Sequence, residues 1–112
     1  MAALEDVRRL ALTLPRTSEH LIHDRVKFRV KQLVYVAFSR DETLMGFAFP
    51  REERADLVAR DGRYLLPGTS DLRFNWAACR IALLDLDEME ERVCDAWAMC
   101  VPKFLARERL GG

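Results

Sequence analysis

The segment from Arg25 to Lys31 constrains the fold most, because cations and apolar residues alternate along it without interruption. Successive side chains of a β-strand point to opposite faces of its sheet, so this pattern predicts a strand with one charged and one apolar face. The apolar face needs a covering layer, and a chain of 112 residues supplies one within a single domain. We therefore treat residues 1–112 as one domain built against this strand. The cations that share the charged face are Arg25, Lys27, Arg29 and Lys31.

Two further strands are predicted after this one, at about 33–38 and 43–49. A three-residue connection at 31–33 keeps the apolar side chains of the second strand in the core, whereas a two-residue turn would place them among the arginines. We therefore expect the longer connection. It places Tyr35 on the charged face, beside the cations.

The remaining segments predict helices before and after the strands, with one more strand between them. Proline ends or bends a helix because it lacks an amide hydrogen, so Pro102 predicts a kink in the last one. Grouped strands with flanking helices predict a two-layer α+β fold, an antiparallel sheet with helices packed on one face. The expected order is a helix at 3–14, a loop at 16–24, three strands from 25 to 49, a helix at 50–61, a short strand or loop at 64–66, a strand at 76–84 and a long helix at 87–107.

Short segments spread over nearly the whole chain resemble the MmcQ/YjbR-like family. The resemblance implies a two-layer fold related to secretion chaperones. That family is commonly described as DNA-binding, by analogy with wing-like hairpins, and the resemblance brings no catalytic residues to this chain. Residues 69–75 depart from the glycine-rich approach to the tryptophan that family members often have. The similar segments are LTLP (12–15), KFRV (27–30), the strand ending in VYVAF (33–38), FPREERADL (49–57), YLLP (64–67), Trp76 and VPKFL (101–105).

The charged sheet face is the first candidate site. Cations two residues apart on a strand lie about 6.6 Å apart, and a nucleic-acid strand presents a phosphate about every 3.4 Å, so the row matches every second phosphate. We expect a non-enzymatic module that binds the DNA backbone without sequence preference, with Gly46 and Ala48 as a shallow floor. Four backbone contacts give a salt slope of about −3.6 on duplex DNA. The expected contact residues are Arg25, Lys27, Arg29, Lys31, Tyr35, Trp76, Arg80 and, from the VPK ending of the family, Lys103.

Two other interpretations of the same surface stay open. Alternating charge also keeps a half-exposed sheet soluble, and lysines on an edge prevent strands of other molecules from pairing there. A protein-interaction module, pairing with a partner or with a second copy of itself, is the second functional hypothesis. Its expected anchors are Trp76, Trp97 and Met99, because aromatic residues and methionine are enriched at interface centres. Trp97 also lies on the apolar stripe of the last helix with Met89, Val93 and Phe104, and this spacing favours a place in the core for it.

A metal or catalytic site is the third hypothesis, and the sequence gives it little support. His20, His23 and Asp24 lie close in sequence, but zinc needs three or four ligands that converge, and a loop does not ensure this. The sequence has no phosphate-binding glycine loop, GxSxG or HExxH motif. We therefore predict no catalytic residue, no metal ligand and no cofactor.

The charge balance and the cysteine content limit the partners and the cellular environment that we expect. Lysine plus arginine equals aspartate plus glutamate, at 18 each, so any attraction to DNA or to a membrane requires a local patch. An odd cysteine count (Cys79, Cys94 and Cys100), no CxxC pair and no signal peptide predict a reducing, cytoplasmic environment. No run approaches the ~18 apolar residues of a spanning helix, so no membrane partner is expected.

Overall fold

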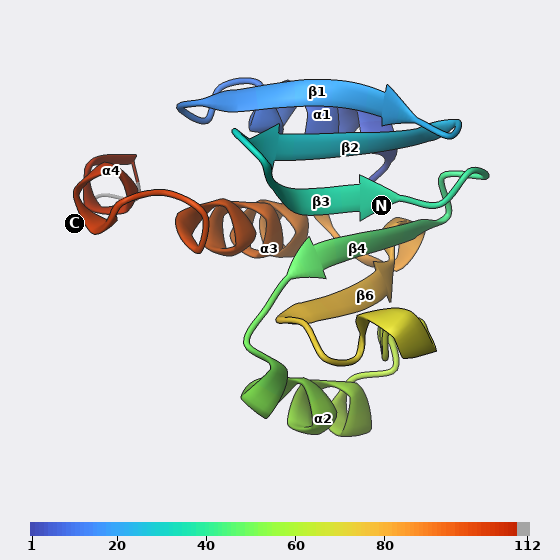
Figure 1. Cartoon of the computed structure of the whole chain (residues 1–112). Helices are drawn as coiled ribbons and strands as arrows, with labels where there is room; N and C mark the ends of the chain where they lie inside the picture. Colours follow the sequence, from blue (N-terminus) through green and yellow to red (C-terminus); the bar gives the residue numbers. More distant parts are fainter. Residues whose placement is uncertain (110–112) are drawn as a thin grey trace.

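The computed structural model describes residues 1–109 and shows a six-stranded antiparallel sheet with helices on one face, which confirms the predicted α+β class (Figure 1). The strand order is β1-β2-β3-β4-β6-β5. The strands are β1 (Thr17–Ile22), β2 (Arg25–Val30), β3 (Leu33–Phe38), β4 (Leu44–Ala48), β5 (Tyr64–Leu65) and β6 (Trp76–Arg80). The helices are α1 (Leu4–Ala11), α2 (Arg51–Arg60), α3 (Leu86–Ala98) and α4 (Lys103–Arg109), with 3₁₀ turns at Thr69–Asp71 and Ile81–Leu83.

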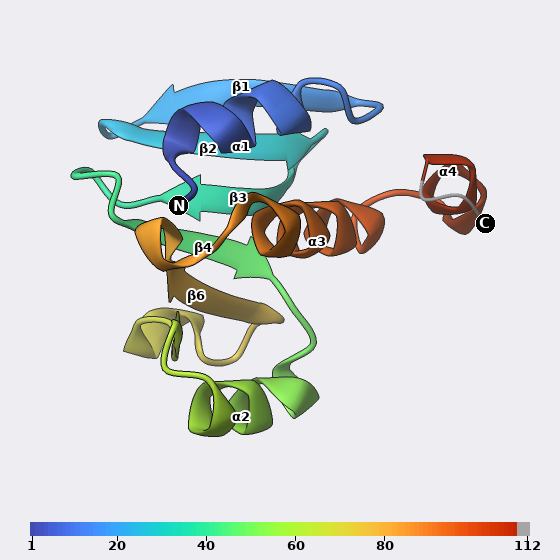
Figure 2. The ribbon, with the colours of Figure 1, turned by 180° about the vertical axis from the view of Figure 1, so that it is seen from behind.

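The two faces of the sheet have different surroundings. Figure 2 shows α1 and α3 lying across one face, whereas Figure 1 shows the strands from the other side with no helix in front of them. Helix α2 lies beyond β6 at one end of the sheet, and α4 lies to the side, beyond the end of α3 (Figure 1). The sheet therefore has a covered face, which packs on α1 and α3, and an open face.

The hydrophobic core lies between the covered face and the helices. Phe28 of β2, Phe47 of β4 and Val93 of α3 are completely buried there. Trp97 of α3 is also completely buried, and its indole Nε1 donates a hydrogen bond of 2.8 Å to the carbonyl of Pro15. A buried tryptophan contributes a large apolar area and needs such a partner for its N–H. Trp97 is therefore a core residue, as its place on the apolar stripe of the last helix predicted, and it does not anchor an interface.

Residues 17–22, predicted as part of a loop, form the edge strand β1. All six residues pair with β2, from Thr17 opposite Val30 to Ile22 opposite Arg25. The hairpin turns at His23 and Asp24, whose φ angles of 53° and 64° suit a two-residue turn that follows the twist of the strands. The strand was missed because its polar residues occupy both faces, so hydrophobic alternation does not mark it.

The connection between β2 and β3 also differs from the prediction. It is a two-residue turn in which Lys31 adopts φ 54°, and Val30 lies opposite Leu33. A bulge then shifts the register, because Arg29 faces Val34 while the preceding Phe28 faces Val36. The extra residue of a bulge restores the inward direction of the side chains that follow. The core pattern of β3 is thus kept by a bulge rather than by a longer turn.

The predicted C-terminal helix is two helices separated by residues 99–102. Pro102 interrupts the predicted helix rather than bending it. Its ring and its missing amide hydrogen prevent the helix from continuing through this segment. Met89 and Val93 are buried as predicted, but Phe104 of α4 is 58% exposed. Similarly, the strand predicted at 76–84 ends at Arg80 and continues as a 3₁₀ turn.

Candidate functional site

The open face displays alternate residues of five strands. Residues directly opposite each other on neighbouring strands point to the same face, so the register defines this surface. On the side of β1 and β2 it is polar and cationic, and over β3, β4 and β6 its side chains are mainly small or apolar. These residues are Ser18, His20, Ile22, Arg25, Lys27, Arg29, Val34, Ala37, Leu44, Gly46, Ala48, Trp76, Ala78 and Arg80.

The strand cations Arg25, Lys27 and Arg29, hereafter the cation row, lie side by side on this face. Within residues 1–109, none of the three forms an ion pair with a carboxylate. The row therefore carries positive charge that is not held in an ion pair within the described residues. The residues directly opposite it on β1, none of which carries a carboxylate, are Ile22, His20 and Ser18.

The guanidinium of Arg29 contacts His20 along this face and still has N–H groups that can donate further hydrogen bonds. Its Nη2 lies 3.4 Å from Nδ1 of His20, whose Nε2 lies 2.9 Å from the Ser18 hydroxyl oxygen. A guanidinium only donates, so the arrangement assigns the His20 proton to Nε2, which donates to Ser18. Nε of Arg29 is buried and has no hydrogen-bond partner within the part of the chain that the structure describes. Arg29 is thus oriented by its neighbours without being neutralised.

A groove of about 600 Å³ adjoins the cation row. Arg25 and Lys27 line it on one side, and Phe74 and Trp76 line it on the other. The groove exists because the sheet carries almost no side-chain bulk at its centre. The floor residues are Ala37, Gly46, Ala48 and Ala78.

Gly46 allows the indole of Trp76 to lie directly on the sheet. A Cβ at position 46 would lie 2.6 Å from Nε1 of Trp76, closer than non-bonded atoms approach. Within residues 1–109, that N–H has no hydrogen-bond acceptor, whereas the indole N–H of Trp97 donates to the Pro15 carbonyl. The groove wall therefore presents an aromatic ring with a free donor.

Four predicted contact residues lie where the sequence placed them. Arg25, Lys27 and Arg29 share the open face, and Trp76 stands across the groove from them with Gly46 and Ala48 beneath. Arg80 is exposed on the same face, opposite Leu44, but does not line the groove. Their roles in binding stay predictions.

Tyr35 is not part of this surface, and its predicted position is wrong. It is completely buried, and its hydroxyl lies 2.8 Å from Oγ1 of Thr17. Burial raises the pKa of Tyr35 to about 12. The cause is the bulge in β3, which turns Tyr35 and Val36 toward the core together. Tyr35 thus has no access to a ligand on the open face.

Lys31 and Lys103 lie apart from the strand positions of the row. Lys31 occupies the turn after β2, because the strand ends at Val30. Lys103 begins α4 and is not among the residues that line the groove. Helix α4 lies beyond the end of α3, to the side of the sheet (Figure 1). The helix break at Pro102 explains this, since it carries α4 away from the sheet.

Sequence reasoning missed Asp71, Phe74 and His20. Asp71 and Phe74 belong to the irregular segment that forms the second groove wall, and Phe74 is 51% exposed. An aromatic residue in an irregular segment has no periodic pattern to indicate its direction. His20 was placed in a loop because β1 lacks apolar alternation, although the Ser-x-His spacing matches one face of a strand.

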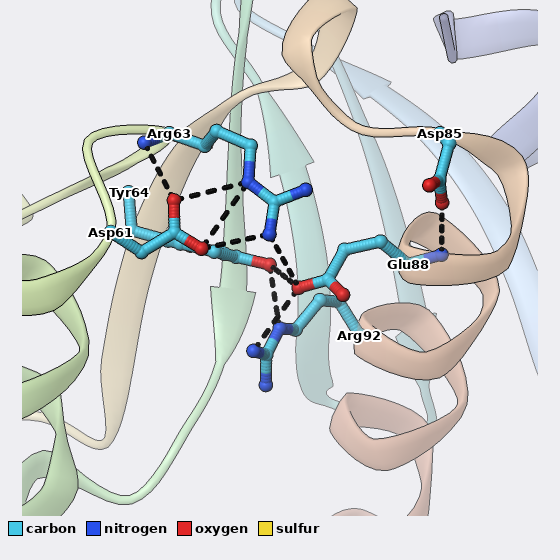
Figure 3. A network of polar contacts seen from close by, with 6 residues as sticks. All are labelled: Asp61, Arg63, Tyr64, Asp85, Glu88 and Arg92. Carbon is cyan, nitrogen blue, oxygen red and sulfur yellow. Dashed lines mark hydrogen bonds and ion pairs between the residues drawn. The ribbon is translucent and has the colours of Figure 1, made fainter.

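The covered side carries a different arrangement of charge, in which every charged member has a partner (Figure 3). The Tyr64 hydroxyl donates to Glu88 and accepts from Nε of Arg92 at 2.7 Å. Glu88 lies 3.2 Å from Arg92 and 3.5 Å from Arg63, which in turn lies 2.7 Å from Asp61. The hydrogen bond from Arg63 lowers the pKa of Asp61 to about 2, whereas burial and the Glu88 contact raise that of Tyr64. This network joins the segment around β5 to α3.

No metal-binding group of three or more His, Cys, Asp or Glu side chains occurs in residues 1–109. His20 lies in β1 and His23 in the turn that follows it. The three cysteines are free thiols, and burial raises the pKa of each. Within the described range, no helix combines the length and apolar character needed to span a bilayer.

Comparison with solved structures identifies the same arrangement of strands and helices in a known protein. The fold is that of a two-layer α+β domain with one open sheet face. The crystal structure of the Deinococcus radiodurans protein DR2400, a DUF419 domain, matches with a TM-score of 0.74 and 16% sequence identity. The match covers 99% of this chain and 89% of that one, so the likeness extends to the entire fold. No protein-family model and no curated protein matches the sequence.

Proposed function

We propose that the chain is a non-enzymatic binding module whose open face binds nucleic acid, DNA first, through the phosphate backbone. The observation that carries the proposal is the cation row, which has no ion-paired carboxylate within residues 1–109 and lies on the sheet face opposite α1 and α3 (Figure 1). Phosphate contacts by lysine and arginine supply most of the affinity in binding without sequence preference. The row provides such groups at regular spacing.

The pairing of other arginines strengthens this argument. Arg8, Arg60, Arg63 and Arg92 each approach a carboxylate within about 3.2 Å. Arg54 instead donates to three main-chain carbonyls. These contacts use five arginines within the protein's own structure, whereas the three cations of the row lie together on one sheet face and have no carboxylate partner within residues 1–109.

We further propose that the chain is a distant member of the MmcQ/YjbR-like family, to which DUF419 domains belong, and acts in the cytoplasm. The whole-chain likeness to the DR2400 fold and the similar short segments support the family assignment. The three free thiols support the compartment, because they suit a reducing environment. The family's description as DNA-binding agrees with the interface proposed here.

A salt titration of a fluorescently labelled duplex tests the proposal. Three phosphate contacts predict a slope of about −2.7 in the logarithm of the binding constant against that of salt concentration, since each contributes about −0.9. The double variant Arg25→Ala/Lys27→Ala should reduce the slope to about −0.9. Arg9→Ala/Arg107→Ala is the control, because it removes equal charge from α1 and α4. Absence of binding at about 50 mM salt, or equal losses in both variants, would contradict the proposal.

A protein partner, including a second copy of the chain, is the second candidate. Leu33 and Met99 line one part of the groove and are 56% and 44% exposed, and Phe104 of α4 is 58% exposed nearby in sequence. Exposed apolar residues that gather in one patch mark protein interfaces more often than apolar residues scattered singly over a surface do. If the partner is a second copy of the chain, size-exclusion chromatography with light scattering should show a dimer, and a monomer at high concentration would exclude self-association.

A further inference from the structure

We infer that the groove receives an unpaired nucleobase while the cation row holds the adjoining phosphates, so that single-stranded nucleic acid is the preferred ligand. The inference rests on the proposed function and specifies its ligand class. Its basis is the juxtaposition, within one groove, of Arg25 and Lys27 on one side and Trp76 and Phe74 on the other.

The chemistry of the groove goes beyond what a phosphate backbone requires. Its lining is mainly apolar and aromatic, with Leu44, Pro67 and Met99 in addition to the small residues of the floor. A polyanion alone would gain nothing from such a surface. A nucleobase has two apolar faces and stacks on aromatic side chains, and basic grooves with aromatic walls are typical of proteins that bind single strands.

The charges around the groove also give the ligand a direction. The cations lie at the β2 side, whereas Asp71 lies in the segment that carries Phe74. A carboxylate repels phosphate and accepts hydrogen bonds from base amino groups, so the base should lie toward Asp71 and Trp76. The free N–H of Trp76 adds a donor for a base carbonyl.

The size and shape of the groove agree with this occupant. Its volume of about 600 Å³ falls within the range of ~300–1,000 Å³ that small-molecule sites occupy. Gly46 and Ala78 lie opposite each other in its floor, and the indole of Trp76 lies on Gly46, so part of the floor is an aromatic ring. In a duplex the bases remain stacked inside the helix, so only the row would be used and the groove would remain empty.

The test compares three fluorescently labelled probes of equal length: a mixed-sequence single strand, its duplex, and a strand whose bases are replaced by abasic sites. The single strand should bind about tenfold more tightly than the abasic strand, which corresponds to stacking of one base. Emission of Trp76 should be quenched only by the strand that carries bases. Trp97, which is completely buried, provides the unchanged background emission.

Two variants keep the test independent of a folding defect. Trp76→Ala removes the aromatic wall, and Ala78→Leu fills the floor without altering any cation. Both should remove the advantage of the single strand over the abasic strand and leave the salt slope of abasic binding unchanged. Circular dichroism confirms that each variant folds.

The outcomes separate this inference from the proposed function. If base-bearing and abasic strands bind equally well and with equal salt dependence, or if the duplex binds more tightly than the single strand, the groove inference is wrong while the backbone proposal stands. If none of the three probes binds at low salt, the proposed function itself fails. Tighter binding of a mononucleotide than of the strand would also overturn the inference, because it would remove the need for adjoining phosphates.

Discussion

The two sides of the sheet use the same kinds of charged residues in opposite ways. On the covered side, Arg63 and Arg92 share Glu88, and Asp61 completes the network (Figure 3). On the open side, Arg25 and Lys27 have no carboxylate partner in the part of the chain that the structure describes. The first arrangement contributes to stability, and the second leaves charge available for a ligand. A net charge of zero therefore conceals a local excess, because acids are concentrated elsewhere.

The largest expected difference concerns the two tryptophans. Trp97→Ala should lower the free energy of unfolding by about 3–5 kcal/mol, because it empties a buried site and leaves the Pro15 carbonyl without its donor. Trp76→Ala should cost less than half as much, since Trp76 is only partly buried on the open face. Urea denaturation of both variants measures this. Equal losses would mean that the open face is also part of the core.

A smaller difference is expected between the two sets of cations. Arg92→Ala should lower the free energy of unfolding by about 1–3 kcal/mol, because Glu88 and the Tyr64 hydroxyl lose a partner in a half-buried site. Lys27→Ala should change it by at most about 0.5 kcal/mol, as is usual for an exposed or half-exposed residue without a specific contact. The same denaturation experiment compares them. A loss for Lys27→Ala as large as that for Arg92→Ala would show that the row is structural.

The smallest effect is the pH dependence that Asp61 of the covered side contributes to stability. The pKa of Asp61 is about 2 in the folded chain, below its ordinary value of 3.8, so its contribution is present above pH 3.8 and is lost as pH falls toward 2. The melting temperature of Asp61→Asn should be lower than that of the native chain at pH 6, and the gap should narrow between pH 4 and 2.

Lys27→Ala is the control for this titration, because Lys27 has no ion-pair partner within residues 1–109. Its melting temperature should follow that of the native chain across the same pH range. A gap for Asp61→Asn that stays constant down to pH 2 would contradict the role assigned to the Asp61–Arg63 pair.

The fold was predictable in regular strands and helices, where the direction of one side chain determines the directions of its neighbours. Alternation from Arg25 to Val30 correctly placed the two faces of β2, and the helical spacing of Met89, Val93 and Trp97 correctly placed the buried side of α3. Strand β1 was not predictable by this route. Its covered side includes Glu19, which pairs with Arg8 of α1 rather than with apolar residues.

The candidate site was only partly predictable, for two physical reasons. A bulge in β3 and a longer turn before it both bring the apolar residues of β3 into the core, so hydrophobic alternation cannot distinguish them. The chain uses the bulge, which turns Tyr35 away from the open face. The groove wall at Asp71 and Phe74 arises from an irregular segment whose path depends on contacts distant in sequence. One such contact is the bond from Arg54 to the carbonyl of Phe74.

The central claim is that a nucleic acid binds the open face and leaves the covered face unperturbed. Amide and indole chemical shifts, followed by NMR during titration with a short single-stranded oligonucleotide, test it most directly. We predict shifts at Lys27, Gly46 and the indole N–H of Trp76, with Glu88 and the indole N–H of Trp97 unchanged. Shifts concentrated on α3, or none at a salt concentration of about 50 mM, would contradict the account.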